Sequence, residues 1–68
     1  MKVIERKTAK FDNDSYVLYT FNTGNQYRVW NSGSEVGYTR SGNYTNQITL
    51  AKLRKTASEY EDRRIQTA

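Results

Sequence analysis

The residues of this chain that are best suited to chemistry are aromatic and cationic side chains, many of them at two-residue spacing between Tyr16 and Tyr38. Aromatic rings stack on nucleic-acid bases while cations neutralise phosphates. Trp, Tyr and Arg also dominate the binding energy of protein interfaces. This pattern therefore indicates a recognition surface. Its predicted members are Arg6, Lys10, Tyr16, Arg28 and Trp30 on one sheet face, with Lys52 and Lys55 as further candidates on a helix.

Catalytic and metal-binding chemistry has few candidate residues. The chain has no histidine and no cysteine, which removes the commonest general base, the usual zinc ligands and a thiol nucleophile. Asp12-Asn13-Asp14 begins like a calcium loop, but Val17 and Thr23 stand where that loop needs Gly and Glu. We predict no catalytic residue, no cofactor and no metal site. A metal-free ribonuclease that uses Tyr, Arg and Lys, as in small toxin nucleases, is kept as a third hypothesis.

The charge balance suggests two classes of partner. Eleven Lys and Arg against seven Asp and Glu give a net charge of +4, which favours nucleic acid only if the positive residues share one face. We predict a small non-enzymatic binding protein that recognises nucleic acid or a nucleoprotein complex through a basic, aromatic sheet face. The alternative is a stoichiometric inhibitor or adaptor, of the kind encoded by phages or mobile elements, that contacts a host protein.

Two other interpretations of the same face stay open. Trp30, Leu18 and Ile4 could simply cover one another as a minor apolar cluster, because scattered exposed apolar residues are normal. They could also be buried across a two-fold axis in a homodimer. No window is apolar enough to span a membrane, and the N-terminal residues lack the apolar run of a signal peptide. Together with the absence of cysteine, this predicts a cytoplasmic protein.

The elements that must position these residues follow from the hydrophobic period. Alternation through residues 2–40, broken by turns with Asp, Asn or Gly, predicts an antiparallel meander of three to four strands with an N-terminal edge strand. The period then changes to about 3.6. The expected fold is α+β, in the order β-β-β-β-α, with one helix on one sheet face. We expect a single domain over 1–68, with the sheet in 1–45, the helix in 49–64 and a frayed tail in 65–68.

The expected register assigns each side chain to a face. Pairing Phe21 with Tyr27 and Val29 with Val36 keeps cross-strand hydrophobic pairs together. The predicted core face is then Val17, Tyr19, Phe21, Tyr27, Val29, Val36 and Tyr38. The opposite face would present Ile4, Arg6, Thr8, Lys10, Tyr16, Leu18, Thr20, Arg28 and Trp30, with Gly37 opposite Arg28.

The helix should begin at an N-cap, Thr49, with Ile48 and Leu53 as a hydrophobic staple. Leu50, Leu53, Ala57 and Tyr60 form one apolar stripe at helical spacing. This stripe should pack on the core face of the sheet.

In layout, a meander followed by one packed helix is similar to the arm-binding domains of phage-type integrases and to AP2-type domains, whose sheets enter a DNA groove. Small phage-encoded inhibitors of bacterial defence, including anti-CRISPR proteins, look similar in the same way. The likeness covers Tyr16 to about Arg64 and includes no signature residues. It therefore implies a layout and assigns no functional position.

Overall fold

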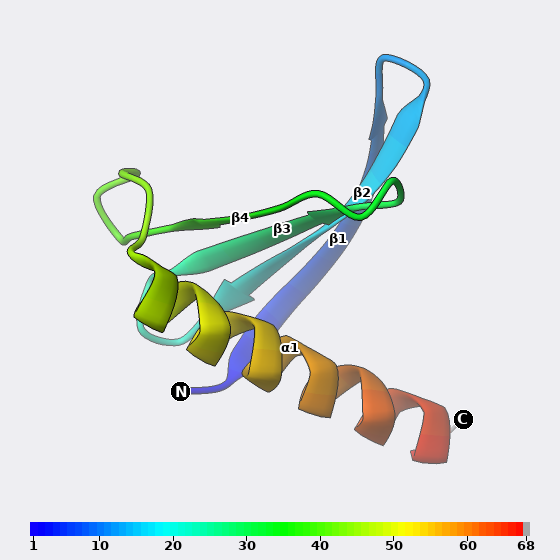
Figure 1. Cartoon of the computed structure of the whole chain (residues 1–68). Helices are drawn as coiled ribbons and strands as arrows, with labels where there is room; N and C mark the ends of the chain where they lie inside the picture. The colour runs from blue at the N-terminus through cyan, green and yellow to red at the C-terminus, as the bar shows by residue number, and fades with distance from the viewer. Residues whose placement is uncertain (68) are drawn as a thin grey trace.

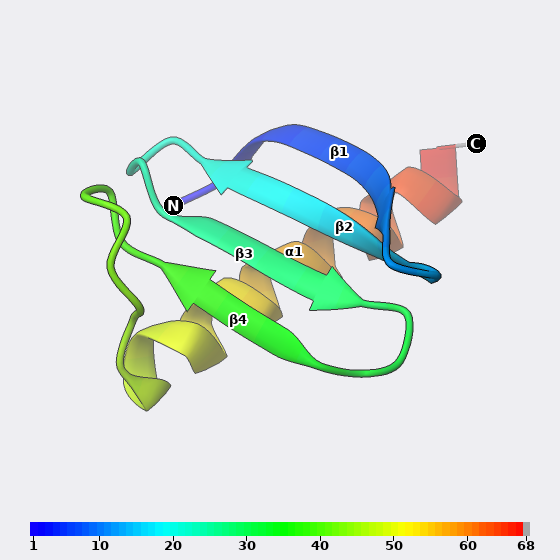
Figure 2. The same ribbon diagram turned by 90° about the horizontal axis from the view of Figure 1, so that it is seen from above.

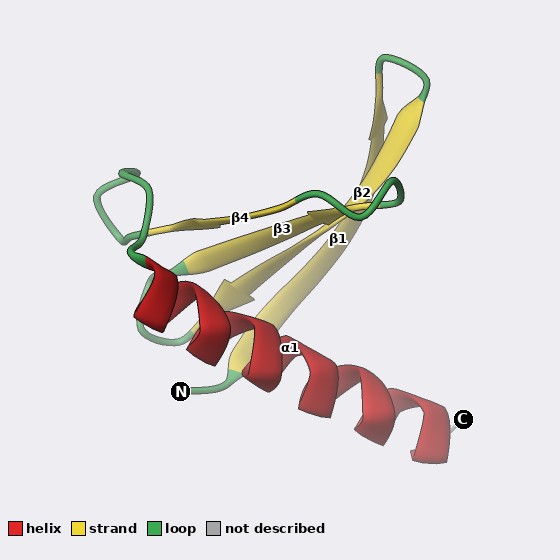
Figure 3. Ribbon diagram, viewed as in Figure 1, coloured by secondary structure: helices red, strands yellow, loops and turns green. Residues whose placement is uncertain are grey.

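The computed structural model describes residues 1–67 and shows one open antiparallel sheet with one helix packed on it. The strands are β1 (Val3–Phe11), β2 (Asp14–Phe21), β3 (Gln26–Trp30) and β4 (Glu35–Tyr38), and the helix is α1 (Gln47–Thr67). The strand order is β1-β2-β3-β4, so each strand pairs with its neighbours in the chain. Figure 1 and Figure 3 show α1 on one side of the sheet. The predicted α+β fold is confirmed.

Three short turns connect the strands, and each contains residues with positive φ. Asp12 and Asn13, with φ of 53° and 68°, connect β1 to β2, as the two central residues of a type I′ hairpin do. Gly24 (φ 92°) and Gly33 (φ 106°) lie in the next two turns, where a residue without Cβ adopts this conformation without strain. Because the turns are short, strands that pair in the sheet are also consecutive in the sequence.

The observed register between β2 and β3 differs from the predicted one by two residues. Tyr19 pairs with Tyr27 and Val17 pairs with Val29. The Phe21 N–H donates to the Asn25 carbonyl over 2.9 Å, which closes the turn. Because side chains alternate with period two, a shift of two residues changes the partners and preserves the faces.

Between β3 and β4 the shift is one residue, and the prediction for β4 is wrong. Trp30 and Ser34 close this turn, with a 2.8 Å bond from the Trp30 N–H to the Ser34 carbonyl. Tyr27 therefore pairs with Gly37. The shift puts Val36 and Tyr38 on the face away from α1, and Gly37 under the helix instead of opposite Arg28.

The prediction for β1 is also wrong from its third residue onward, because of a bulge. Val3 pairs with Phe21, but Glu5 pairs with Thr20 and Arg6 with Tyr19. The extra residue reverses the side-chain alternation that follows it. Arg6, Thr8 and Lys10 consequently lie on the helix side of the sheet, whereas Glu5, Lys7 and Ala9 lie on the other side.

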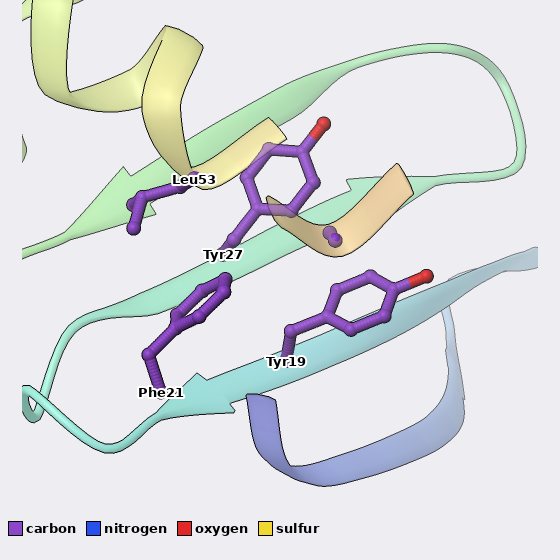
Figure 4. Packing of buried hydrophobic residues seen from close by; sticks show 5 residues of the cluster. Tyr19, Phe21, Tyr27 and Leu53 are labelled. Atoms are coloured by element: carbon purple, nitrogen blue, oxygen red, sulfur yellow. The ribbon is translucent and has the colours of Figure 1, made fainter. Parts of the chain in front are cut away.

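The core lies between β2, β3 and α1 (Figure 4). Phe21 and Leu53 are fully buried, and Tyr19, Tyr27 and Ala57 are at most 5% exposed. Half-buried residues packed around them are Val3, Val17, Val29, Leu50 and Tyr60. The predicted stripe on the helix is confirmed.

Gly37 allows the first turns of α1 to approach the sheet closely. A Cβ built on it would lie 2.6 Å from Thr45 Oγ1 and 3.1 Å from Leu53 Cδ1. Both distances are shorter than ordinary van der Waals contact, so a larger residue would push the helix away. A glycine inside a strand often marks such a close approach.

The helix begins earlier than predicted, and Asn46 is its N-cap. The Asn46 side-chain oxygen accepts a 2.8 Å hydrogen bond from the Thr49 N–H, and its carbonyl accepts one from the Leu50 N–H. Asn is among the best N-cap residues. Ile48 is 71% exposed, so it does not form the expected staple. The helix continues through residues 65–67 of the predicted tail, and Ala68 lies outside the described residues.

Candidate functional site

The sheet face that α1 leaves uncovered, called the outer face below, carries a cluster of aromatic residues around one arginine. Figure 2 shows the four strands side by side with α1 on one side of them only. The register places Tyr16 and Trp30 opposite each other, and Arg28 between Leu18 and Val36 on the neighbouring strands. All five residues are half-buried. The aromatic–arginine cluster is defined here as Tyr16, Arg28, Trp30 and Tyr38.

Arg28 lies at the centre of this cluster. Its guanidinium carbon is 4.6 Å from the ring centroid of Tyr16, 5.6 Å from that of Tyr38 and 5.8 Å from that of Trp30. Cation–π contacts of this kind contribute about 0.5–2 kcal/mol each, depending on desolvation. Residues of three strands thus hold the Arg28 guanidinium in a fixed position against aromatic rings.

Two ring pairs extend the cluster across the sheet. The rings of Tyr16 and Trp30 meet edge to face with centroids 4.8 Å apart. Tyr38 stacks on Tyr44, with centroids 5.7 Å apart, and the backbones of these two residues also form a β-bridge. Tyr44 is 76% exposed. The outer face therefore ends in a tyrosine that is open to a partner.

A hollow of about 310 Å³ lies at the Tyr16–Trp30 end of β2 and β3, on the helix side of the sheet. It is lined by Thr8, Val17 and Val29 as well as by Tyr16 and Trp30. Because Thr8, Val17 and Val29 lie on the helix side, this hollow is not part of the outer face.

The outer face carries little formal charge. Besides Arg28, the register brings Glu5 and Lys7 to it from β1 and Asp14 from β2, and Glu5 and Lys7 pair with each other at 3.6 Å. Nucleic-acid surfaces need several cations along the backbone path. Among the described strand residues, Arg28 is the only cation of this face without an ion pair, and one cation does not form such a track.

Of the seven residues predicted as a site, the structure brings together Tyr16, Arg28 and Trp30. Arg6 lies on the helix side, where its Nε donates a 2.6 Å bond to Glu61. The bulge in β1 is the reason. Lys10 is exposed on the same side, at the end of β1, where it pairs with Ser15 of β2. Lys52 and Lys55 are exposed on α1, across the sheet from the cluster.

Tyr38 and Tyr44 were missed as site residues. The incorrect register of β4 places Tyr38 in the core, and the expected register assigns Tyr44 to neither face. The signal that could have found Tyr38 is Gly37, because a glycine fits the face where the helix approaches and its neighbours must then point away.

Ionisable groups on the helix side form two Tyr–Glu–Arg groups that connect α1 to the sheet. In the first, Glu61 accepts hydrogen bonds from the Tyr19 hydroxyl (2.7 Å), Arg6 and Arg64. Burial raises the pKa of Glu61, but these three bonds outweigh it and the net pKa lies below the ordinary value. Burial, followed by the bond to Glu61, raises the pKa of Tyr19 to about 12.

In the second group, Glu35 binds Arg54 through a charge-assisted contact and accepts a hydrogen bond from the Tyr27 hydroxyl. The bond from Arg54, then that from Tyr27, lowers the pKa of Glu35. Burial is the main reason that the pKa of Tyr27 is raised. A carboxylate with a lowered pKa is a poor general acid, and a tyrosine with a raised pKa is a poor base at neutral pH. Both groups have the properties of structural contacts that stabilise the packing of α1 on the sheet.

Within residues 1–67, no three His, Cys, Asp or Glu side chains are grouped so that they could hold a metal ion. In the same range α1 is too polar to cross a lipid bilayer. Comparison of the chain with protein-family models, with curated proteins and with solved structures finds no significant match.

Proposed function

We propose that this chain is a non-enzymatic protein-binding module, a stoichiometric inhibitor or adaptor, that docks on its partner through the outer face. The observation that carries the proposal is the Arg28 guanidinium held among the rings of Tyr16, Trp30 and Tyr38 on the sheet face without a helix. Trp, Tyr and Arg are the residues that most often dominate protein interfaces. Their fixed positions also reduce the entropy lost on binding.

The geometry favours a protein partner over nucleic acid. Base stacking needs open ring faces, and the guanidinium of Arg28 already lies over three of the rings. Arg6 and Lys10, which would have neutralised phosphates on this face, lie on the other side. Binding of nucleic acid by the outer face is one of the outcomes that would contradict the proposal.

The proposal of a non-enzymatic role rests on how the polar groups of the core are used. Glu35 and Glu61 are each held by arginine and tyrosine. The absence of cysteine suits a reducing compartment, so the cytoplasm is the compartment in which we propose that the module acts.

A pull-down from the native cells, with and without nuclease, tests the proposal. The whole chain is compared with Trp30→Ala and Tyr44→Ala on the outer face and with Lys52→Ala/Lys55→Ala on α1. We expect the same partner protein to be retained by the wild type and the α1 variant after nuclease treatment, and lost by both outer-face variants.

Two outcomes would contradict the proposal. Loss of the partner on nuclease treatment would assign the face to a nucleic acid or a nucleoprotein. Retention by Tyr44→Ala and by a folded Trp30→Ala would remove the outer face from binding altogether. Tyr44→Ala is included because its exposed ring can be removed with little effect on folding.

A further inference from the structure

Arg28 differs from the other half-buried cation of the described chain in having no counter-charge. Within residues 1–65, where side-chain burial is described, only Arg6 and Arg28 are half-buried among the Lys and Arg residues. Arg6 forms an ion pair with Glu61, with 2.6 Å between Arg6 Nε and Glu61 Oε1. No carboxylate of residues 1–67 forms an ion pair with Arg28.

The aromatic rings around Arg28 satisfy the cation only in part. A ring attracts the flat face of a guanidinium, but the N–H groups at its edge need acceptors with lone pairs. The Nε atom of Arg28 is buried without a hydrogen-bond partner. A half-buried charge without a counter-charge costs free energy in the isolated molecule, and a buried polar atom without a partner is rare enough to require an explanation.

We propose that the partner presents an Asp or Glu carboxylate to Arg28, carried on a segment whose neighbouring side chains are apolar. This inference rests on the proposed function and specifies the partner's chemistry. One guanidinium with free terminal nitrogens matches one carboxylate. The half-buried Leu18, Val36, Trp30 and Tyr38 around it match apolar neighbours.

Charge complementarity excludes two other occupants from the proposal. A nucleic-acid strand brings a series of phosphates, but on the described strands the register places only one other cation on the outer face, Lys7, and it pairs with Glu5. A second copy of this chain would bring a second Arg28 to the interface in an isologous dimer.

A titration of the ¹⁵N-labelled whole chain, followed by NMR, tests the inference. The probes are the peptides acetyl-Leu-Glu-Phe-amide and acetyl-Leu-Gln-Phe-amide, which differ in one charge, and oligothymidylate. We expect the Glu peptide to shift the Trp30 indole and Arg28 Nε–H signals saturably and to bind about tenfold more tightly than the Gln peptide.

Three variants identify the residue responsible. Arg28→Gln should abolish the preference for the Glu peptide, whereas Lys52→Gln/Lys55→Gln, which removes two charges from α1, should preserve it. Arg28→Lys should retain part of the preference, because it keeps the charge but loses the planar fork.

The inference is overturned if both peptides bind equally, if neither shifts outer-face signals, or if Arg28→Gln keeps the preference. It is also overturned if oligothymidylate binds more tightly than the Glu peptide in an Arg28-dependent manner. If the peptide titration fails but the outer-face variants still lose the partner in the pull-down, the outer face remains a docking surface for a partner of different chemistry. If the outer-face variants retain the partner in the pull-down, the proposed function itself is wrong.

Discussion

The Tyr19 hydroxyl of β2 donates a 2.7 Å hydrogen bond to the Glu61 carboxylate of α1 and joins residues that are 42 positions apart. Tyr19 is only 5% exposed, so its hydroxyl depends on a protein acceptor. The same carboxylate binds Arg6 of β1. One glutamate thus fixes the later turns of the helix over two strands.

Removing the Tyr19 hydroxyl should therefore destabilise the fold. Tyr19→Phe is expected to lower the free energy of unfolding by about 1–2 kcal/mol, since a bond to a charged acceptor is lost. Tyr60→Phe is the matched control: Tyr60 is half-buried and packs edge to face on Tyr19, but no hydrogen bond to its hydroxyl is present among the described residues. Urea unfolding measures both. Equal effects would mean that Tyr19 acts through packing alone.

Acid should destabilise the protein through Glu35 and Glu61. Their pKa values are lowered in the folded chain, so the unfolded chain binds protons more readily as the pH falls below the ordinary value of 4.5. The stabilisation is fully present above that pH and is lost as the pH falls through the folded pKa values.

Thermal unfolding as a function of pH measures this effect. The midpoint should be flat around neutral pH and fall in acid, with a shallower fall in Glu35→Gln/Glu61→Gln. Glu59→Gln, on the exposed side of α1, should keep the wild-type profile. If the midpoint of the double variant falls in acid as steeply as that of the wild type, other groups control acid unfolding.

The same substitution should reduce stability at Arg6 much more than at Arg28. Arg6→Met breaks the ion pair with Glu61 and should cost about 1–3 kcal/mol. Arg28→Met loses cation–π contacts but removes a charge without a counter-charge, so its free energy of unfolding should change by less than about 1 kcal/mol. Urea unfolding of the two variants compares them directly. A large loss for Arg28→Met would identify Arg28 as a structural residue.

Gly37→Ala should destabilise the packing of α1 on β4. The new Cβ would lie 2.6 Å from Thr45 Oγ1 and 3.1 Å from Leu53 Cδ1, and overpacking of this kind costs about 1–3 kcal/mol. Ser34→Ala, at an exposed position in the preceding turn, is the control. An unchanged urea midpoint for Gly37→Ala would show that the helix can move away at no cost.

The alternation of residues from Tyr16 to Val29 was enough to predict the sheet, its core on β2 and β3, and the helix stripe. It could not predict the two one-residue shifts, because alternation alone specifies neither the bulge after Val3 nor the length of the turn closed by Trp30 and Ser34. Each such shift moves the side chains of the strand to the opposite face of the sheet. Arg6 was therefore lost from the predicted site and Tyr38 was gained.

The central claim is that the partner contacts the outer face and not the helix. Photo-crosslinking tests it most directly, with a benzophenone side chain placed at Tyr44 on the outer face or at Ser58 on the exposed side of α1. In nuclease-treated native cells, the probe at Tyr44 should give a discrete crosslinked protein and the probe at Ser58 should not. The same crosslinked protein from both positions, or from Ser58 alone, would contradict the account.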